Sequence, residues 1–210
     1  MKNIATRLAS TALVLAAAAA PAAAQVTVSG STLGCFGMGC TNFAAAQSYG
    51  ISGTGETIQF TGSSFSGTTN PVTNGVSIGN FGSFVLTPAP NGTTPNTTFS
   101  TPFTLLFQLT APNGASSPTE TFTVSGFVGN VNGQGARDIS YGGGSTTFTF
   151  AGGSGTITTN PDAIGTQANQ IGGRITATAS TVPEPSTYAL MGMGLVSLAA
   201  AVRRRRNTVA

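Results

Sequence analysis

Two cysteines are the residues best suited to chemistry in the middle of the chain. Cys35 and Cys40 are separated by four residues, two of which are glycine. Redox catalysis prefers a two-residue spacing beside a helix that lowers the thiol pKa, and a zinc site would need two further ligands. In an oxidising compartment, a structural disulfide is favoured over two free thiols.

Carboxylates are the other candidates, because the chain contains no histidine and therefore lacks the usual serine, cysteine and imidazole acid–base schemes. A glycosidase would need two carboxylates that face one bond, and the spacing along the chain does not exclude such a pair. Isolated, exposed carboxylates are nevertheless far more common. We therefore expect no catalytic residue, cofactor or metal site, with a hydrolase that uses Glu56 or Glu120 as the weaker alternative. The central carboxylates are Glu56, Glu120, Asp138 and Asp162.

The net charge of +3 reflects the ends of the chain rather than its middle. Six of the eight basic residues lie at the two ends, and residues 25–182 carry a net charge of −2. Because nucleic acids need a basic surface, this distribution argues against a nucleic-acid partner. The two neighbouring charges Arg137 and Asp138 are expected in a turn or a solvated loop.

The N-terminal residues have the order that is typical of a secretory signal peptide. Lys2 and Arg7 precede an apolar stretch, residues 8–20, and an alanine-rich end follows. We predict that residues 1–24 are a signal peptide that is cleaved after Ala24. Export would bring the two cysteines into an oxidising compartment and so supports the disulfide.

The C-terminal residues form three successive parts. Pro183 and Pro185 favour an extended backbone before them. The apolar segment Tyr188–Val202 has 15 uncharged residues. A helix of that length reaches about 22 Å, so bilayer thinning or snorkelling arginines would have to cover a hydrocarbon core of about 30 Å. The sequence predicts a single C-terminal transmembrane helix, with the basic cluster that follows it held in the cytoplasm. This basic cluster consists of Arg203, Arg204, Arg205 and Arg206.

In this order the three parts resemble the PEP-CTERM sorting signal of Gram-negative bacteria. The signal occupies residues 182–206, with Pro183, Glu184 and Pro185 as the sorting motif. The resemblance implies that an exosortase, a membrane cysteine peptidase, recognises the tail and cleaves it near the motif. It also implies transient anchoring in the inner membrane, followed by display on the cell surface or release to the outside.

Residues 25–181 are expected to form one β-rich extracytoplasmic domain. Glycine, threonine, serine and asparagine are abundant there, and charges are few. Such a composition favours short strands separated by turns such as Asn113-Gly114. The sequence predicts an all-β fold whose body is an antiparallel β-sandwich, jelly-roll-like in topology. The expected strands are Val26–Ser29, Thr57–Phe60, Gly82–Thr87, Phe103–Thr110, Glu120–Val128, Thr146–Phe150, Gly155–Thr159 and Ile175–Ala179.

Two segments of this body give opposite signals. The run Phe103–Leu109 is the most apolar and is predicted to be a central strand. The preceding residues 88–102 contain four prolines and are predicted to form a surface loop. Residues 53–68 and 78–86 resemble, in composition, the choice-of-anchor domains of the K type. This second resemblance implies a strand-rich domain with no well-defined activity.

The sequence favours a non-enzymatic exported protein of the envelope or extracellular matrix. The resemblance to sorted proteins implies association with exopolysaccharide or biofilm, through a weakly charged surface that hydrogen-bonds to hydrated polymer. The alternative is a carbohydrate-binding, lectin-like module with a defined pocket. Tryptophan is absent, so Tyr49 and Tyr141 would have to supply the rings on which a sugar stacks.

Overall fold

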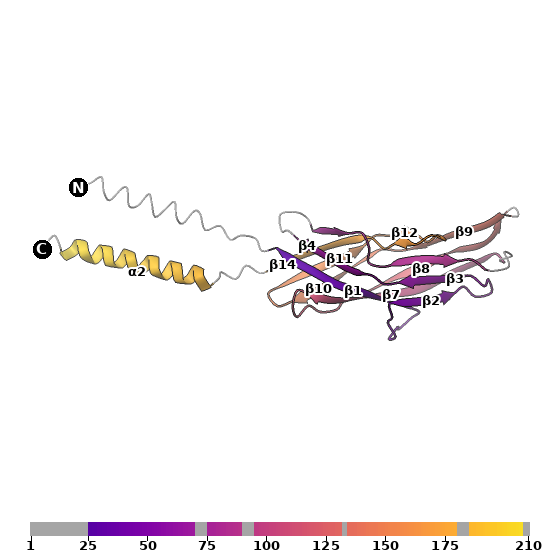
Figure 1. The fold of residues 1–210 in the computed structure, drawn as a ribbon, viewed down its shortest axis with the longest axis horizontal. Coiled ribbons are helices and arrows are strands. Elements are labelled where there is room, and N and C mark those ends of the chain that lie inside the picture. The colour runs from indigo at the N-terminus through magenta and orange to yellow at the C-terminus, as the bar shows by residue number, and fades with distance from the viewer. Residues whose placement is uncertain (1–24, 70–74, 90–94, 132–133, 180–184, 208–210) are drawn as a thin grey trace. The chain divides into compact units, whose positions relative to one another are not determined.

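A computed structural model describes residues 25–69, 75–89, 95–131, 134–179 and 185–207. The chain divides into a compact body, Ala24–Ala179, and a second unit that contains the C-terminal helix (Figure 1). The predicted signal peptide, residues 1–24, lies outside the described residues, as do Pro183 and Glu184 of the sorting motif.

The described part of the body consists of strands that pair antiparallel with their neighbours. Threonine, valine, isoleucine and phenylalanine suit these strands because branched and aromatic side chains pack well on a pleated surface. The bounds of the strands are β1 (Val26–Phe36), β2 (Ala46–Gly50), β3 (Thr57–Thr61), β4 (Ser64–Thr69), β5 (Val76–Ile78), β6 (Ser83–Thr87), β7 (Thr97–Ala111), β8 (Thr119–Val131), β9 (Gln134–Tyr141), β10 (Gly144–Phe150), β11 (Gly153–Thr159), β12 (Asp162–Ala163), β13 (Asn169–Gln170) and β14 (Gly173–Ala179).

These strands form three sheets that enclose one core. A six-stranded sheet has the order β12-β9-β8-β7-β1-β4, and two four-stranded sheets have the orders β10-β11-β14-β5 and β13-β6-β3-β2. Strand β10 lies against β8, and β14 lies against β1 and β4. The ring of Phe84 in β6 lies 5.0 Å from that of Phe103 in β7. Both four-stranded sheets therefore pack on the six-stranded one, which confirms the predicted antiparallel β-rich body.

The topology differs from the predicted jelly roll. Strands β7, β8 and β9 are successive neighbours in the six-stranded sheet, as three strands of a Greek key would be. The next strand, β10, would have to return beside β7 to complete that motif. Instead β10 belongs to a four-stranded sheet, and β1 is the strand beside β7.

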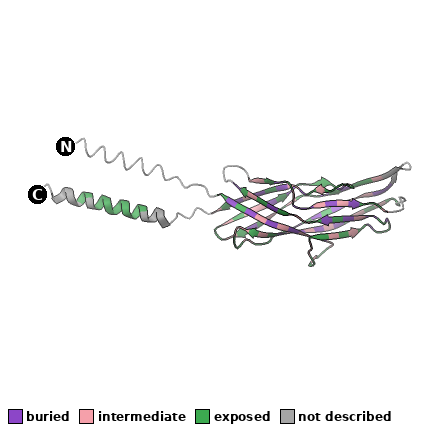
Figure 2. Cartoon of the chain, in the orientation of Figure 1, coloured by how far each residue is buried: buried purple, intermediate pink, exposed green. Residues whose placement is uncertain are grey.

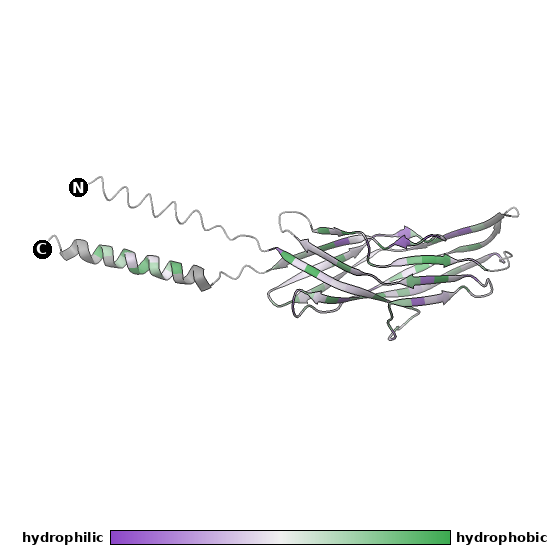
Figure 3. Ribbon diagram, viewed as in Figure 1, coloured by the Kyte–Doolittle hydropathy of each residue, from purple (hydrophilic) through white to green (hydrophobic). Residues whose placement is uncertain are grey.

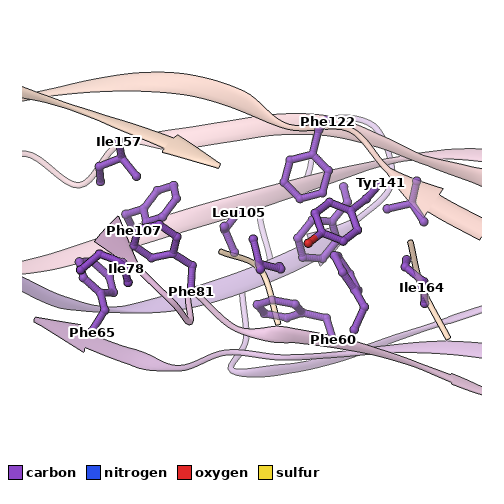
Figure 4. Close-up of a cluster of buried hydrophobic side chains, with 14 of the residues drawn as sticks. Phe60, Phe65, Ile78, Phe81, Leu105, Phe107, Phe122, Tyr141, Ile157 and Ile164 are labelled. Atoms are coloured by element: carbon purple, nitrogen blue, oxygen red, sulfur yellow. The ribbon is translucent and has the colours of Figure 1, made fainter. Parts of the chain in front are cut away.

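The core is built from alternating residues of the long strands. In β7, the side chains of Phe103, Leu105 and Phe107 are fully buried, whereas the residues between them are partly exposed. Phenylalanine rings from different sheets meet in this core, as where Phe60 of β3 lies 4.9 Å from Phe103 of β7. Figure 4 shows part of this cluster of buried side chains. Each such ring stabilises the fold by about 2–3 kcal/mol through burial. The run around Phe103 is therefore the central strand that its apolar character predicted.

All eight predicted strands are present, most of them within longer strands. Strands β2, β4, β5, β9, β12 and β13 were not predicted, because they are short or carry few apolar residues. The predicted surface loop at residues 88–102 is wrong from Thr97 onward, since β7 begins there and includes Pro102. Pro102 has no N–H to donate, yet its carbonyl accepts a hydrogen bond from the N–H of Gly37.

The C-terminal unit contains helix α2 (Pro185–Asn207), which begins at a proline, a favoured residue for the first helical position. Its described side chains are exposed (Figure 2), and many are hydrophobic (Figure 3). Among the described residues, no helix is both long and apolar enough to cross a membrane. The prediction of a helix here is confirmed, but that of a transmembrane span is not supported. The exposed large hydrophobic residues of the helix are Leu190, Met191, Met193, Leu195, Val196, Leu198 and Val202.

Candidate functional site

The predicted disulfide is present and closes a small loop at the end of β1. Cys35 and Cys40 are joined by a disulfide whose Cα atoms lie 5.9 Å apart. Gly37 and Gly39 have positive φ angles of 106° and 67°, which glycine adopts without strain, and Met38 lies between them. The disulfide has a structural role in this geometry: it fixes the path of the loop.

Two backbone contacts hold the same loop against the body. The N–H of Gly37 donates to the carbonyl of Pro102 in β7 at 2.9 Å. After the loop, Ala44 returns to β1 and exchanges two hydrogen bonds with Gly34, of 2.9 and 3.1 Å. The loop is therefore fixed at its base, at its return and through the disulfide.

A groove lies between this loop and the outer face of the six-stranded sheet. Its volume is about 430 Å³. On the sheet side, the hydroxyls of Thr104 in β7 and Thr121 in β8 are hydrogen-bonded to each other at 2.9 Å. On the loop side lie Met38 and Phe43. One wall is thus apolar and the other carries hydroxyl groups.

Glu56 is buried and forms an ion pair with Arg137, 81 residues later in the chain. The Nη2 and Nε atoms of Arg137 lie 2.9 and 3.1 Å from Oε1 of Glu56. The prediction that Arg137 and Asp138 lie in a turn or loop is wrong, because both belong to β9. Their alternation in the strand lets Arg137 reach Glu56 while Asp138 is exposed.

Glu120 in β8 is also buried, but within the described residues it forms no ion pair with Lys or Arg. Its Oε1 accepts a hydrogen bond of 2.7 Å from the hydroxyl of Thr159 in β11. Its Oε2 is buried and has no hydrogen-bond partner among the described residues. Burial raises the pKa of the Glu120 carboxyl, and the hydrogen bond from Thr159 lowers it to a smaller extent.

The structure does not join the four central carboxylates into one site. Glu56 is bound to Arg137, Glu120 is enclosed between two sheets, and Asp138 and Asp162 are exposed. Within the described ranges, His, Cys, Asp and Glu side chains form no group of three that could hold a metal ion. The groove beside the disulfide loop also has no carboxylate among its described lining residues.

The two tyrosines on which a lectin-like module would have to stack a sugar lie in different surroundings. Tyr141 is 2% exposed, and its ring packs 5.2 Å from that of Phe84. Burial and the negative charge of Asp162 raise the pKa of its hydroxyl to about 12. Tyr49 is half-buried and stacks on Phe36 at 5.5 Å. Tyr141 is therefore a core residue.

The outer face of the sheet β10-β11-β14-β5 is covered with hydroxyl groups. Thr147, Thr156 and Thr176 are register partners on three adjacent strands. All outward-facing positions of the four strands carry serine or threonine, except Arg174. The six-stranded sheet has similar pairs on its outer face, such as Thr27 with Thr68 at 3.1 Å. The sandwich thus presents uncharged hydroxyl groups on both sides. The remaining outward residues of the four-stranded sheet are Ser77, Ser145, Thr149, Ser154, Thr158 and Thr178.

The sorting motif and the basic cluster lie at the C-terminal end of the chain. Pro185 is the first residue of α2, and Arg203 to Arg206 fall within the bounds of the same helix. Helix α2 belongs to a different compact unit from the body, which ends at Ala179.

The groove beside the disulfide loop and the residues that line it could not be predicted from the sequence. Met38, Thr104 and Thr121 are unremarkable in the sequence, because they are distant from one another along the chain. One signal was available: a methionine between two glycines inside a short cysteine loop must be exposed when the disulfide forms. The partner strands β7 and β8 could not be placed beside that loop from local patterns.

Comparison with known proteins gives one match. Residues 181–206 match the PEP-CTERM protein-sorting motif. No curated protein and no solved structure matches the chain. The motif supports an exported protein that is sorted at the membrane and processed by an exosortase. The resemblance of the body to choice-of-anchor domains of the K type stays a prediction.

Proposed function

We propose that the chain is a non-enzymatic protein of the cell envelope or extracellular matrix that associates with exopolysaccharide or biofilm polymer. In this proposal residues 1–24 direct export, and the C-terminal helix holds the chain at the inner membrane until an exosortase cleaves near Pro183. The body is then displayed at the surface or released. No nucleic acid and no cofactor takes part.

The observation that carries the proposal is the surface of hydroxyl groups on both outer faces of the sandwich, where charges such as Arg174 and Asp138 are few. Hydroxyl groups both donate and accept hydrogen bonds, so they match the hydroxyl groups and bound water of a neutral polymer. Many of the threonines are held in register by the sheets, which lowers the entropy lost on binding. The described carboxylates are bound, enclosed or scattered, which supports a role without catalysis.

The full chain, expressed in a host with an exosortase and in the same host without it, tests the proposal. The intact mass should show loss of residues 1–24 in both hosts, and loss of the basic cluster Arg203–Arg206 in the first alone. The cleaved protein should sediment with the extracellular polysaccharide. A matched control, with Pro183 and Pro185 changed to alanine, should keep its tail. The proposal is overturned if the cleaved protein stays free of polysaccharide, or if the tail survives in the exosortase host.

A lectin-like module is the second candidate, and the groove beside the disulfide loop is the observation that favours it. Flat hydroxyl surfaces bind polymer weakly and without selecting one sugar, whereas a groove with an apolar wall can select a sugar residue. Binding that saturates with one purified glycan and fails with others would favour this candidate over a passive matrix role.

A further inference from the structure

We propose that the groove between the disulfide loop and strands β7 and β8 binds a short stretch of a neutral polysaccharide chain. The inference deepens the second candidate function, the lectin-like module, and takes the class of polymer from the proposed function. It goes further by assigning a place on the body and the side chains that make the contacts: Met38, Phe43, Thr104, Thr119 and Thr121.

The size and charge of the groove fit such a ligand. Its volume of about 430 Å³ lies in the range of about 300–1,000 Å³ that is usual for small-molecule sites. The described residues that line it include no Asp, Glu, Lys or Arg. A charged polymer would lose hydration there without gaining an ion pair, so the groove favours a neutral one.

The two walls match the two kinds of surface on a sugar ring. The C–H face of a pyranose is apolar and packs on side chains such as Met38 and Phe43, whereas its rim carries hydroxyl groups. Thr104 and Thr121 use one hydrogen and one lone pair in their mutual bond of 2.9 Å. The pair therefore keeps a further hydroxyl hydrogen to donate and lone pairs to accept. Thr119 is exposed beside them on β8.

Met38 is the most informative residue of the groove. It is 91% exposed, and no other large hydrophobic residue in the described part of the body is exposed to a similar degree. The disulfide and the bond from Gly37 to Pro102 hold the loop that carries it. A loop already fixed in place loses little conformational entropy on binding, which favours affinity. Methionine also adapts its shape to a partner at low cost.

The depression on the outer face of the four-stranded sheet provides a natural comparison. It has a volume of about 260 Å³ and is lined by threonines such as Thr147, Thr156 and Thr176. Phe148 and Ala177 also line it, but both are buried, so the side chains that it exposes are those of serine and threonine. We therefore expect weaker and less selective binding there than in the groove.

For the test, the full chain is expressed in an exosortase host with ¹⁵N and ¹³C-methyl methionine labels, and its processed form is isolated. Neutral hexasaccharides of glucose, mannose, xylose and galactose are titrated against it and followed by nuclear magnetic resonance. We expect at least one of them to shift the Met38 methyl and the amides of residues 37–43 and 119–121 in a saturable way. Met38→Ser should weaken that binding by about tenfold, since burial of the side chain against the ring is lost.

Two further variants separate the groove from the rest of the surface. Thr104→Val with Thr121→Val should weaken binding, whereas the matched control Thr147→Val with Thr156→Val should leave it unchanged. All four substitutions lie on outer sheet faces, and unchanged near-ultraviolet circular dichroism will show that the core is intact.

Three outcomes overturn the inference. In the first, no hexasaccharide shifts the resonances of the groove residues. In the second, the control pair of substitutions weakens binding as much as the groove pair. In the third, the Met38 signal moves with protein concentration alone, which would indicate a contact with a second copy. If the protein still sediments with extracellular polysaccharide in those cases, the proposed function stands and the groove assignment fails. If sedimentation is lost as well, both fail.

Discussion

Glu56 and Glu120 are both buried in the body, yet the structure accommodates them in different ways. Glu56, 1% exposed, meets the guanidinium of Arg137 through hydrogen bonds of 2.9 to 3.3 Å. Glu120, 5% exposed, has one hydrogen bond from Thr159 and one oxygen without a partner among the described residues. Removal of the cation beside a buried carboxylate destabilises the fold, because the buried charge is left unpaired. A buried carboxyl group without a cation has a raised pKa, because burial disfavours its charged form.

The two glutamates should therefore affect the stability of the body in different ways. The Glu56–Arg137 pair links the turn before β3 to β9, and so joins two sheets by charge. Glu120 and Thr159 join β8 to β11 by a single hydrogen bond. Both glutamates therefore tie the six-stranded sheet to a four-stranded one.

The largest effect is expected from breaking the ion pair. Arg137→Met keeps the aliphatic stem but removes the guanidinium, leaving the carboxylate of Glu56 without its cation. We expect the free energy of unfolding in urea at pH 7 to fall by about 3 kcal/mol. Adding Glu56→Gln should restore much of that loss because the buried charge is gone. An unfolding free energy for Arg137→Met equal to that of the parent would show that the pair does not stabilise the body.

A smaller loss is expected on the Glu120 side. Thr159→Val removes the hydroxyl that donates to Oε1 of Glu120 while keeping the size of the side chain. The unfolding free energy at pH 7 should fall by about 1–2 kcal/mol, because Oε1 of Glu120 loses the hydrogen bond from this hydroxyl. The loss should be smaller at pH 4, where the carboxyl carries its proton. Equal losses at the two pH values would argue against an ionised partner.

The pH dependence of stability is expected to distinguish the two glutamates. Burial raises the pKa of Glu120 above the ordinary 4.5. Between pH 4.5 and the folded-state pKa, the carboxyl is therefore protonated in the folded chain but ionised in the unfolded chain. Stability should therefore rise as the pH falls through the folded-state pKa, and this gain should be complete below 4.5.

Glu120→Gln removes that titrating group. We expect the variant to be more stable than the parent by about 1 kcal/mol at pH 7, and to lack the rise on acidification. Urea titrations at several pH values measure both. A parent curve that ran parallel to that of the variant would show that Glu120 ionises in the folded protein as it does in water.

The smallest effect is expected at the exposed neighbour of Arg137. Asp138→Asn changes a carboxylate on the same strand, but on its solvent-facing side. The unfolding free energy should change by less than about 0.5 kcal/mol, since exposed charges are well hydrated and screened. A loss comparable to that of Arg137→Met would mean that the charge of β9, rather than the buried pair, stabilises the body.

Most of the longer strands could be predicted, because each of them follows from a local sequence pattern. Alternating apolar residues, as in Phe103, Leu105 and Phe107, predict a strand with one buried face wherever it lies. Short strands such as β12 and β13 were missed because two residues carry no periodicity. The jelly-roll topology was wrong because strand order depends on which sheet a strand joins, and β10 carries no local signal of that choice.

The candidate sites show the same division. The disulfide could be predicted, since Cys35 and Cys40 are close in the sequence and export makes oxidation favourable. The burial of Tyr141 could not be predicted, because whether a tyrosine is buried depends on the sheet packed above it. The pairing of Glu56 with Arg137 was missed because the two residues come from different sheets.

Local sequence patterns are enough to predict that this protein is sorted at the membrane and that hydroxyl groups cover much of its surface. The sorting motif at residues 181–206 is contiguous, and threonine or serine alternating with apolar residues gives strands such as β10 and β14 a hydroxyl face. Only the folded chain shows which glutamate lies beside a cation, and that Met38, Thr104 and Thr121 line one groove. The reason is physical: contacts between sheets depend on the register of strands distant in the chain, and no local pattern specifies that register.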